Sequence, residues 1–181
     1  AASDVYKRQA LGTENLADVF ASQFDYVHGS CNGCYPGENS YPYLYRAAYP
    51  ETILTNRFLH DEREDYRRHY NHAFVFGLRF DVSPYRCRKI SVAALPGLGA
   101  HLRRLLLLRE AFGRFFYEGR LIWTRDDVLP AGVRCAEYAH SGERMVAFLN
   151  DGKEPVRFPF RGRTVELEGE FVACVELQAD E

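Results

Sequence analysis

Two carboxylates near the start of the chain have positions that acid–base chemistry could use. Glu14 follows a short run, residues 10–12, that we interpret as the end of a strand, and Asp25 lies inside a predicted strand at 24–28. Two carboxyl groups that face one reacting bond can divide the work, one as proton donor and the other as base or nucleophile. Each also has a structural explanation, because a helix dipole stabilises an acidic first turn and a strand carboxylate can pair with an arginine.

Four further side chains could bind a ligand next to these carboxylates. His28 ends the predicted strand and could donate a hydrogen bond or move a proton. Arg57 ends a second predicted strand, 51–57, where its guanidinium could bind an oxyanion through two N–H groups or pair with one of the carboxylates. Tyr26 and Tyr43 belong to an aromatic-rich stretch, whose rings could stack on a ligand or could simply cover the rim of the fold.

The segments before residue 130 alternate between short apolar runs and helical periodicity, which is typical of βα units. We expect a helix at 13–22 that is capped by Thr13, and strands at 24–28 and 51–57. A long helix should follow, because apolar residues recur there at helical spacing. Its stripe comprises Tyr66, Tyr70, Ala73, Phe74 and Gly77.

The stretch after that helix contains two different patterns. Residues 78–82 (LRFDV) lead into a segment that we interpret as irregular and that Pro96 and Gly97 close. The last helix of this half is expected at about 102–117, with arginines on its solvent side. Its apolar side comprises Leu102, Leu105, Leu106, Phe112 and Phe116.

After Pro130 the apolar residues alternate with a period of about two, which predicts a separate all-β unit of about five strands. A turn is expected at Ser141-Gly142. Asp151-Gly152 is a strong hairpin signal, since both central residues of a type I′ turn need positive φ. Pro159 cannot donate to a ladder, so its strand should lie at an edge or a bulge.

Composition excludes several classes of protein. The net charge of -2 and the pI near 6.3 give no basic excess for binding nucleic acid. The apolar run Leu105 to Leu108 is far too short to span a membrane. Cys31 and Cys34 have the spacing of a zinc pair, but no second close pair follows, so neither a metal nor another cofactor is predicted.

The first residues differ in character from the rest. Residues 3–9 (SDVYKRQ) resemble the translation of a sequencing adapter, so we treat 1–9 as a non-native leader and leave it out of the fold prediction. Native sequence is then expected to begin near Ala10 or Leu11, in the middle of a longer protein.

Five segments together resemble the last part of barrel glycoside hydrolases of the α-galactosidase-like superfamily and related uncharacterised bacterial families. They are GTENLAD, FDYVHG, YRAAYPETILTNR, HYNHAFVFGLRF and LLLLREAFGRFFYEG. The resemblance implies an α/β plus all-β fold: the C-terminal portion of a (β/α)8 barrel at 10–128, then a small antiparallel β-sandwich domain at 129–181. With 181 residues the chain is shorter than the roughly 250 of a complete barrel.

The function that the resemblance implies is cleavage of glycosidic bonds by two carboxylates, once the missing part of the barrel is present. Glu14 and Asp25 would then be catalytic, and the carbohydrate would contact Tyr26, His28, Tyr43 and Arg57. The alternative is a non-catalytic carbohydrate-binding or interaction domain. The sugar, the stereochemical outcome, the oligomeric state and the localisation stay open.

Overall fold

The computed structural model describes residues 10–13, 24–27, 46, 48–60, 66–84, 91–123 and 129–177. Four strands of the first half form a parallel sheet in chain order. Parallel neighbours need crossover connections, and helices usually supply them. The strands are β1 (Gly12–Thr13), β2 (Tyr26–Val27), β3 (Ile53–His60) and β4 (Arg79–Pro84).

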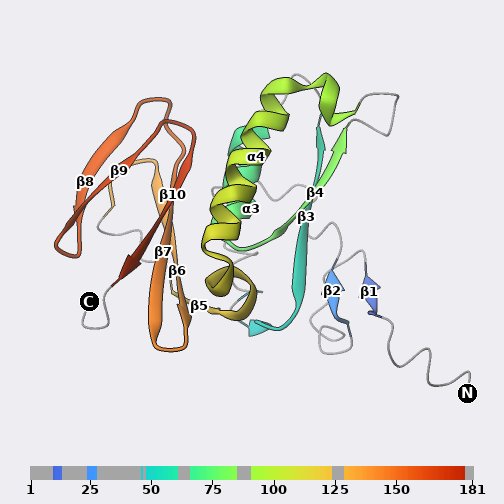
Figure 1. Ribbon diagram of the computed structural model, residues 1–181, viewed down its shortest axis with the longest axis horizontal. Coiled ribbons are helices and arrows are strands. Elements are labelled where there is room, and N and C mark those ends of the chain that lie inside the picture. Colours follow the sequence, from blue (N-terminus) through green and yellow to red (C-terminus); the bar gives the residue numbers. More distant parts are fainter. Residues whose placement is uncertain are drawn as a thin grey trace, which may run out of the picture.

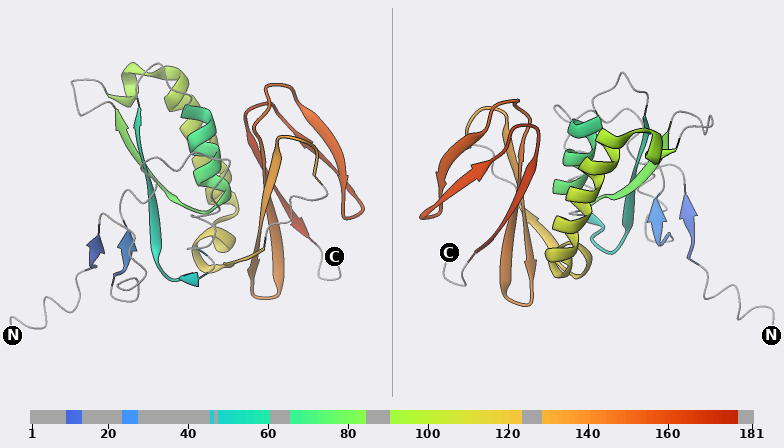
Figure 2. Two further views of the ribbon diagram at one scale, coloured as in Figure 1. Left: turned by 180° about the vertical axis from the view of Figure 1, so that it is seen from behind. Right: turned by 45° about the horizontal axis from the view of Figure 1, so that its top comes forward.

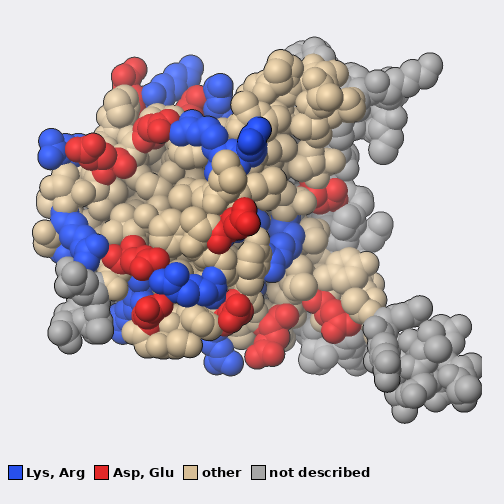
Figure 3. All heavy atoms as spheres, in the orientation of Figure 1, with Lys and Arg blue, Asp and Glu red and all other residues tan. Residues whose placement is uncertain are grey.

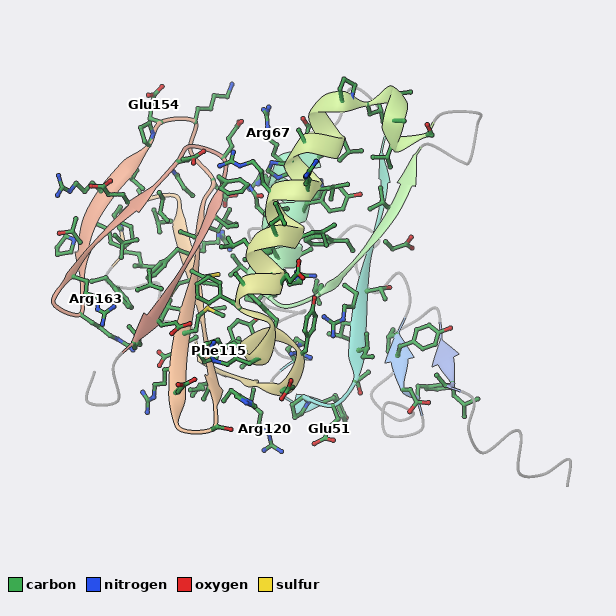
Figure 4. The ribbon with its side chains drawn as sticks, viewed as in Figure 1. Glu51, Arg67, Phe115, Arg120, Glu154 and Arg163 are labelled. Atoms are coloured by element: carbon green, nitrogen blue, oxygen red, sulfur yellow. The ribbon has the colours of Figure 1, made fainter. Side chains whose placement is uncertain are left out.

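Two helices cover one face of this sheet. The crossover from β3 to β4 contains α3 (Tyr66–Val75). After the short η3 (Val92–Ala94), α4 (Pro96–Ala111) begins at its proline, a residue suited to the first helical turn because its missing N–H needs no partner there. The π-helical turn η4 (Arg114–Glu118) follows. Its Phe115 and Phe116 are buried, and Figure 4 shows Phe115 beneath the end of α4.

The remaining strands form an antiparallel sheet of four strands and a separate hairpin. The sheet has the order β10-β7-β6-β5 and the hairpin pairs β8 with β9. Side chains alternate across β7: Met145 and Ala147 face the helices, whereas Val146 and Phe148 face the hairpin. The strands are β5 (Arg120–Trp123), β6 (Val133–His140), β7 (Glu143–Asn150), β8 (Val156–Phe160), β9 (Arg163–Leu167) and β10 (Val172–Leu177).

The layers follow one another as parallel sheet, helix pair, four-stranded sheet and hairpin (Figure 1), and the views in Figure 2 keep that order. One hydrophobic cluster runs through the first three layers and includes Leu54 of β3, Phe74 of α3, Leu105 of α4 and Tyr138 of β6. At the amino end of the parallel sheet, Oε1 of Glu51 lies 3.6 Å from Nη2 of Arg120 in β5. Both residues are labelled in Figure 4. The two halves therefore pack as one body.

The structure corrects two element predictions in the first half. Residues 79–84 form β4 rather than an irregular segment. Thr13 is the last residue of β1, and the rest of the predicted helix at 13–22 lies outside the described residues. The last helix begins at Pro96, six residues before its predicted start. Leu102, Leu105 and Phe116 of the predicted apolar side are buried, and Arg103 and Arg104 are exposed, as predicted. The division is wrong at two positions, because Leu106 is 52% exposed and Arg109 is buried.

The turn predictions of the second half have mixed outcomes. Ser141 and Gly142 turn the chain between β6 and β7 with φ of 49° and 83°, as expected. The Asp151-Gly152 hairpin prediction is wrong, because β7 pairs with β10 and not with β8. The Asn150 side chain explains the difference: its Nδ2 donates to the carbonyls of Glu154 and Glu168 and holds this loop as a crossing between the sheets.

The sheet also reaches across the predicted boundary between 128 and 129. β5 lies before that boundary, yet it pairs with β6 in the antiparallel sheet. Among the described residues 131–177, five strands, β6 to β10, follow Pro130, in agreement with the predicted number.

Gly77, in the turn from α3 to β4, offers a direct test of this packing. Its φ is +67°, and a Cβ there would lie 3.0 Å from the Tyr138 hydroxyl. We expect Gly77→Ala to lower the free energy of unfolding by about 2–3 kcal/mol. Gly142 is the matched control, because its φ is +83° but nothing lies within 4 Å. Denaturant titration should show a smaller loss, about 1 kcal/mol, for Gly142→Ala, and equal losses would contradict the contact with Tyr138.

Candidate functional site

The face of the parallel sheet opposite the helices carries Tyr26, Arg57 and Asp81. In the parallel register Tyr26 pairs with Ile53, and Arg57 pairs with Asp81. Side chains alternate between the two faces of a strand, so positions 53 and 57 share a face. The next residues along β2 and β3, Val27 and Leu54, are each 1% exposed and belong to the core under the helices. The three named residues therefore lie on the face of the sheet opposite the described helices, which we call the uncovered face with respect to these helices.

Tyr26 is held in this position by its neighbour in β1. A Cβ built on Gly12 would overlap the Tyr26 ring, which shows that the ring lies directly against the Gly12 backbone. The Tyr26 side chain is half-buried. Glycine at position 12 is thus needed for the close approach of the two strands, and the predicted ligand-binding residue Tyr26 lies on the uncovered face.

Asp25 lies at the amino end of β2, one residue before the strand begins. Its carboxylate accepts a hydrogen bond of 2.7 Å from the Leu11 backbone N–H, while its own N–H donates to the Leu11 carbonyl at 2.8 Å. These contacts tie the amino ends of β1 and β2 together. Parallel α/β barrels carry their catalytic groups at the opposite, carboxyl ends of the strands. These contacts give the Asp25 carboxylate a structural role that requires no catalysis, and its catalytic role stays a prediction.

Three of the predicted site residues, Glu14, His28 and Tyr43, lie outside the described residues. In the sequence Glu14 directly follows the last residue of β1, and His28 directly follows the last residue of β2. The backbone of Arg57 is described. It lies inside β3, three residues before the strand ends at His60, and not at the predicted strand end.

Asp81 is a candidate that the sequence analysis missed. It is half-buried, and its backbone lies directly across from Arg57. The signal was present: Arg79, Asp81 and Ser83 alternate with two apolar residues, which is the pattern of a strand with one polar face. The alternation was overlooked because residues 78–82 were interpreted as the exit from a helix.

A separate groove of about 540 Å³ lies between α4 and the strands β9 and β10. Its rim includes Arg104. The Cζ of Arg104 lies 3.8 Å from the Phe171 ring centroid, and its Nη2 lies 2.8 Å from Oε1 of Glu168. Figure 3 shows basic and acidic side chains interspersed over this side of the molecule. The groove lies on the helix side of the parallel sheet, away from the face that carries Tyr26.

Within the described ranges, no group of three or more His, Cys, Asp or Glu residues is placed to hold a metal ion. Cys31 and Cys34 lie outside those ranges. In the same part of the chain, none of the helices has the length and apolar character that crossing a membrane requires.

No family model matches the chain, and no curated protein matches it. A solved structure, the crystal structure of a noncanonic maltogenic alpha-amylase AmyB from Thermotoga neapolitana, is similar with a TM-score of 0.50 and 15% sequence identity. The similarity covers 98% of this chain and 55% of that one, so the chain spans about half the length of the solved protein. At this identity the likeness concerns the fold.

Proposed function

We propose that the chain is part of a glycoside hydrolase whose active site lies on the uncovered face of the parallel sheet, towards the carboxyl ends of β1 to β4. The observation that carries the proposal is the topology: four parallel strands in chain order, with the described helices on one face and Tyr26, Arg57 and Asp81 on the other. This is the arrangement of successive βα units in a (β/α)8 barrel, which encloses the uncovered face.

The similarity to a maltogenic alpha-amylase supports both the barrel and the class of substrate. Since the chain spans 55% of that protein, we propose that the remaining barrel strands belong to sequence outside this chain. The antiparallel sheets would then be a C-terminal unit packed on the outside of the barrel helices. Carbohydrate is the proposed substrate, with the linkage left to experiment.

Glu14 is our candidate for a catalytic carboxylate, because it directly follows β1 and the loops after barrel strands form the active site. Glycoside hydrolysis needs a second carboxyl group about 5–9.5 Å from the first. The backbone contacts of Asp25 place it at the other end of β2, so we assign the second carboxyl group to the part of the barrel outside this chain. Arg57 and Asp81 are proposed to bind sugar hydroxyls, with His28 and the ring of Tyr43 at the rim. Tyr26, the first residue of β2, is proposed to contact the carbohydrate deeper on the same face.

The test begins with the upstream reading frame and the longer protein that it encodes. This protein should be screened against chromogenic α- and β-glycosides, including a maltoside, and the rates of its variants compared. We expect Glu14→Gln to abolish turnover, Asp81→Asn to raise KM more than it lowers kcat, and Asp25→Asn to retain kcat. Glu110→Gln is the control, because Glu110 is exposed on the outer helix α4.

Two outcomes would contradict the proposal. Turnover by the 181-residue chain alone would mean that no further barrel strands are needed. A longer protein that binds glycans, cleaves none of them and is unaffected by Glu14→Gln would favour the alternative, a non-catalytic carbohydrate-binding domain. Loss of kcat in Asp25→Asn, with unchanged stability, would restore Asp25 as the second carboxylate.

A further inference from the structure

Three arginine side chains converge on the turn that joins α3 to β4. The Nη1 of Arg109 donates to the Leu78 carbonyl at 2.8 Å. The guanidinium of Arg79, the next residue along the chain, is close enough to the other two for the charge of Arg46 to add to burial in lowering its pKa, and for its own charge to add to burial in lowering the pKa of Arg109. The Nη2 of Arg46 lies 3.6 Å from the position that a Cβ on Gly77 would occupy. Three positive charges are thus gathered beside three consecutive residues, at the amino end of β4.

Two of the three arginines are buried and one is half-buried, and each has an N–H donor without an acceptor among the described residues. Arg46 is 7% exposed and Arg109 is 2% exposed, and Arg79 is half-buried. Four of their nitrogens are buried without a hydrogen-bond acceptor: Nε of Arg46, Nη1 of Arg79, and Nε and Nη2 of Arg109. Buried charges are normally paired with an opposite charge, because leaving water costs several kcal/mol per ion. Within the described ranges, these arginines form no ion pair with a carboxylate.

Aromatic rings compensate only part of this charge. The guanidinium of Arg109 lies 4.2 Å from the Phe80 ring centroid, and that of Arg79 lies 4.1 Å from the Tyr117 centroid. Stacking uses the flat face of a guanidinium, whereas its N–H donors point outward from the edge. Burial, reinforced by the charge of Arg79, lowers the pKa of Arg109 to about 10. No carboxylate of the described residues therefore pairs with the three guanidinium groups.

We propose that Arg46, Arg79 and Arg109 form a binding site for one oxyanion, either a carboxylate or an inorganic anion of the phosphate type. Planar guanidinium groups bind both chemistries through paired N–H donors. Two sources can supply the ligand. One is an acidic side chain on a further strand beside β4, which has β3 as its neighbour among the described strands; this source rests on the proposed function. The other is a free anion.

Tyr117 lies between the site and solvent at Arg79. Its ring centroid is 4.1 Å from the Arg79 guanidinium, and the residue is 52% exposed. Removing the ring exposes Arg79 without removing any of the three charges. Tyr117→Ala should therefore bind an added oxyanion at least as tightly as the unchanged chain.

The experiment titrates the 181-residue chain with inorganic phosphate, in chloride of matched ionic strength, and follows binding by calorimetry and the midpoint of thermal unfolding. At ten times its dissociation constant, phosphate should raise Tm by about 3–6 °C. Arg79→Gln should lose this shift and the calorimetric signal, and Arg79→Lys should weaken them. Phosphate also stabilises proteins without binding to a specific site, and this nonspecific share of the Tm increase should persist in every variant. Arg114→Gln is the matched control, since Arg114 is exposed and paired with Glu143 and Glu176.

Repeating the titration on the longer protein distinguishes the two sources. If the longer protein no longer responds while the 181-residue chain does, a carboxylate of the protein fills the site. If both respond, the ligand is a free oxyanion. The proposal is overturned if phosphate raises the Tm of Arg79→Gln as much as that of the unchanged chain. It is also overturned if phosphate shifts the Tm of no variant. These results are independent of glycosidase turnover, so failure of the proposed function would be seen separately.

Discussion

Replacing Tyr138 with alanine is expected to lower the free energy of unfolding by about 4 kcal/mol. Tyr138 is fully buried on β6, and its ring lies 5.0 Å from the Phe116 ring in an edge-to-face contact. Its hydroxyl donates a hydrogen bond of 2.6 Å to the Val75 carbonyl at the end of α3. The substitution therefore leaves a cavity between the antiparallel sheet and the helices, together with a buried carbonyl that has lost its donor.

Tyr138→Phe separates these two effects. It keeps the ring and removes only the hydroxyl, so we expect a loss of about 1–2 kcal/mol. Both variants should be measured by denaturant unfolding, followed by circular dichroism and by tyrosine and tryptophan fluorescence. Because the helices and the sheet share one core, the two signals should coincide in the unchanged chain. Two separate transitions, with only the second affected by Tyr138→Ala, would contradict a shared core.

Acidification from pH 7 to pH 4.5 is expected to remove about 2–3 kcal/mol of stability through His72 alone. The side chain is 7% exposed, and its pKa is lowered to about 3, first by burial and then by the charges of Arg134, His69 and Arg68. In the unfolded chain the pKa is near 6.5. Between these values the unfolded state binds the additional proton, so stability falls as the pH is lowered from about 6.5 towards 3 and is constant, for this group, above about 7.

The control for this prediction is His72→Gln, which fills similar space and does not titrate. Other ionisable groups also contribute to the acid dependence of stability, and their contribution should remain in the variant. Urea unfolding at several pH values should give a shallower pH dependence for His72→Gln. Identical curves for the two proteins would show that His72 is not held neutral by burial.

Periodicity predicted the second half of the fold well and the first half less well. The strands after Pro130 carry alternating apolar residues, and this local pattern fixes both their type and their faces. The pairing of β7 with β10 was not predictable, because it depends on the Asn150 side chain binding the carbonyls of Glu154 and Glu168. In α4 the charge of Arg109 suggested solvent, whereas the helix geometry places it one turn after buried Leu105.

The candidate site depends on where strands begin, and sequence patterns locate strand ends poorly. Asp25 was expected inside a strand, but β2 starts one residue later, and the register with β1 and β3 sets that limit. Register is a property of the assembled sheet. Position 57 was recognised as chemically useful, while its cross-strand neighbour Asp81 was missed because β4 was not recognised as a strand.

Both faces of the sheet β10-β7-β6-β5 are buried, and this limits where recombination between genes can divide the chain. One face of the sheet contributes to the core with α3 and α4, and the other packs on the hairpin of β8 and β9. Recombination at residue 128 would strip the first face and leave apolar side chains in water on both products. The C-terminal strands therefore do not form an independently exchangeable unit. Moving them together with α3 and α4 would not avoid this exposure, because these helices pack on Val27 and Leu54 of the parallel sheet through the same core.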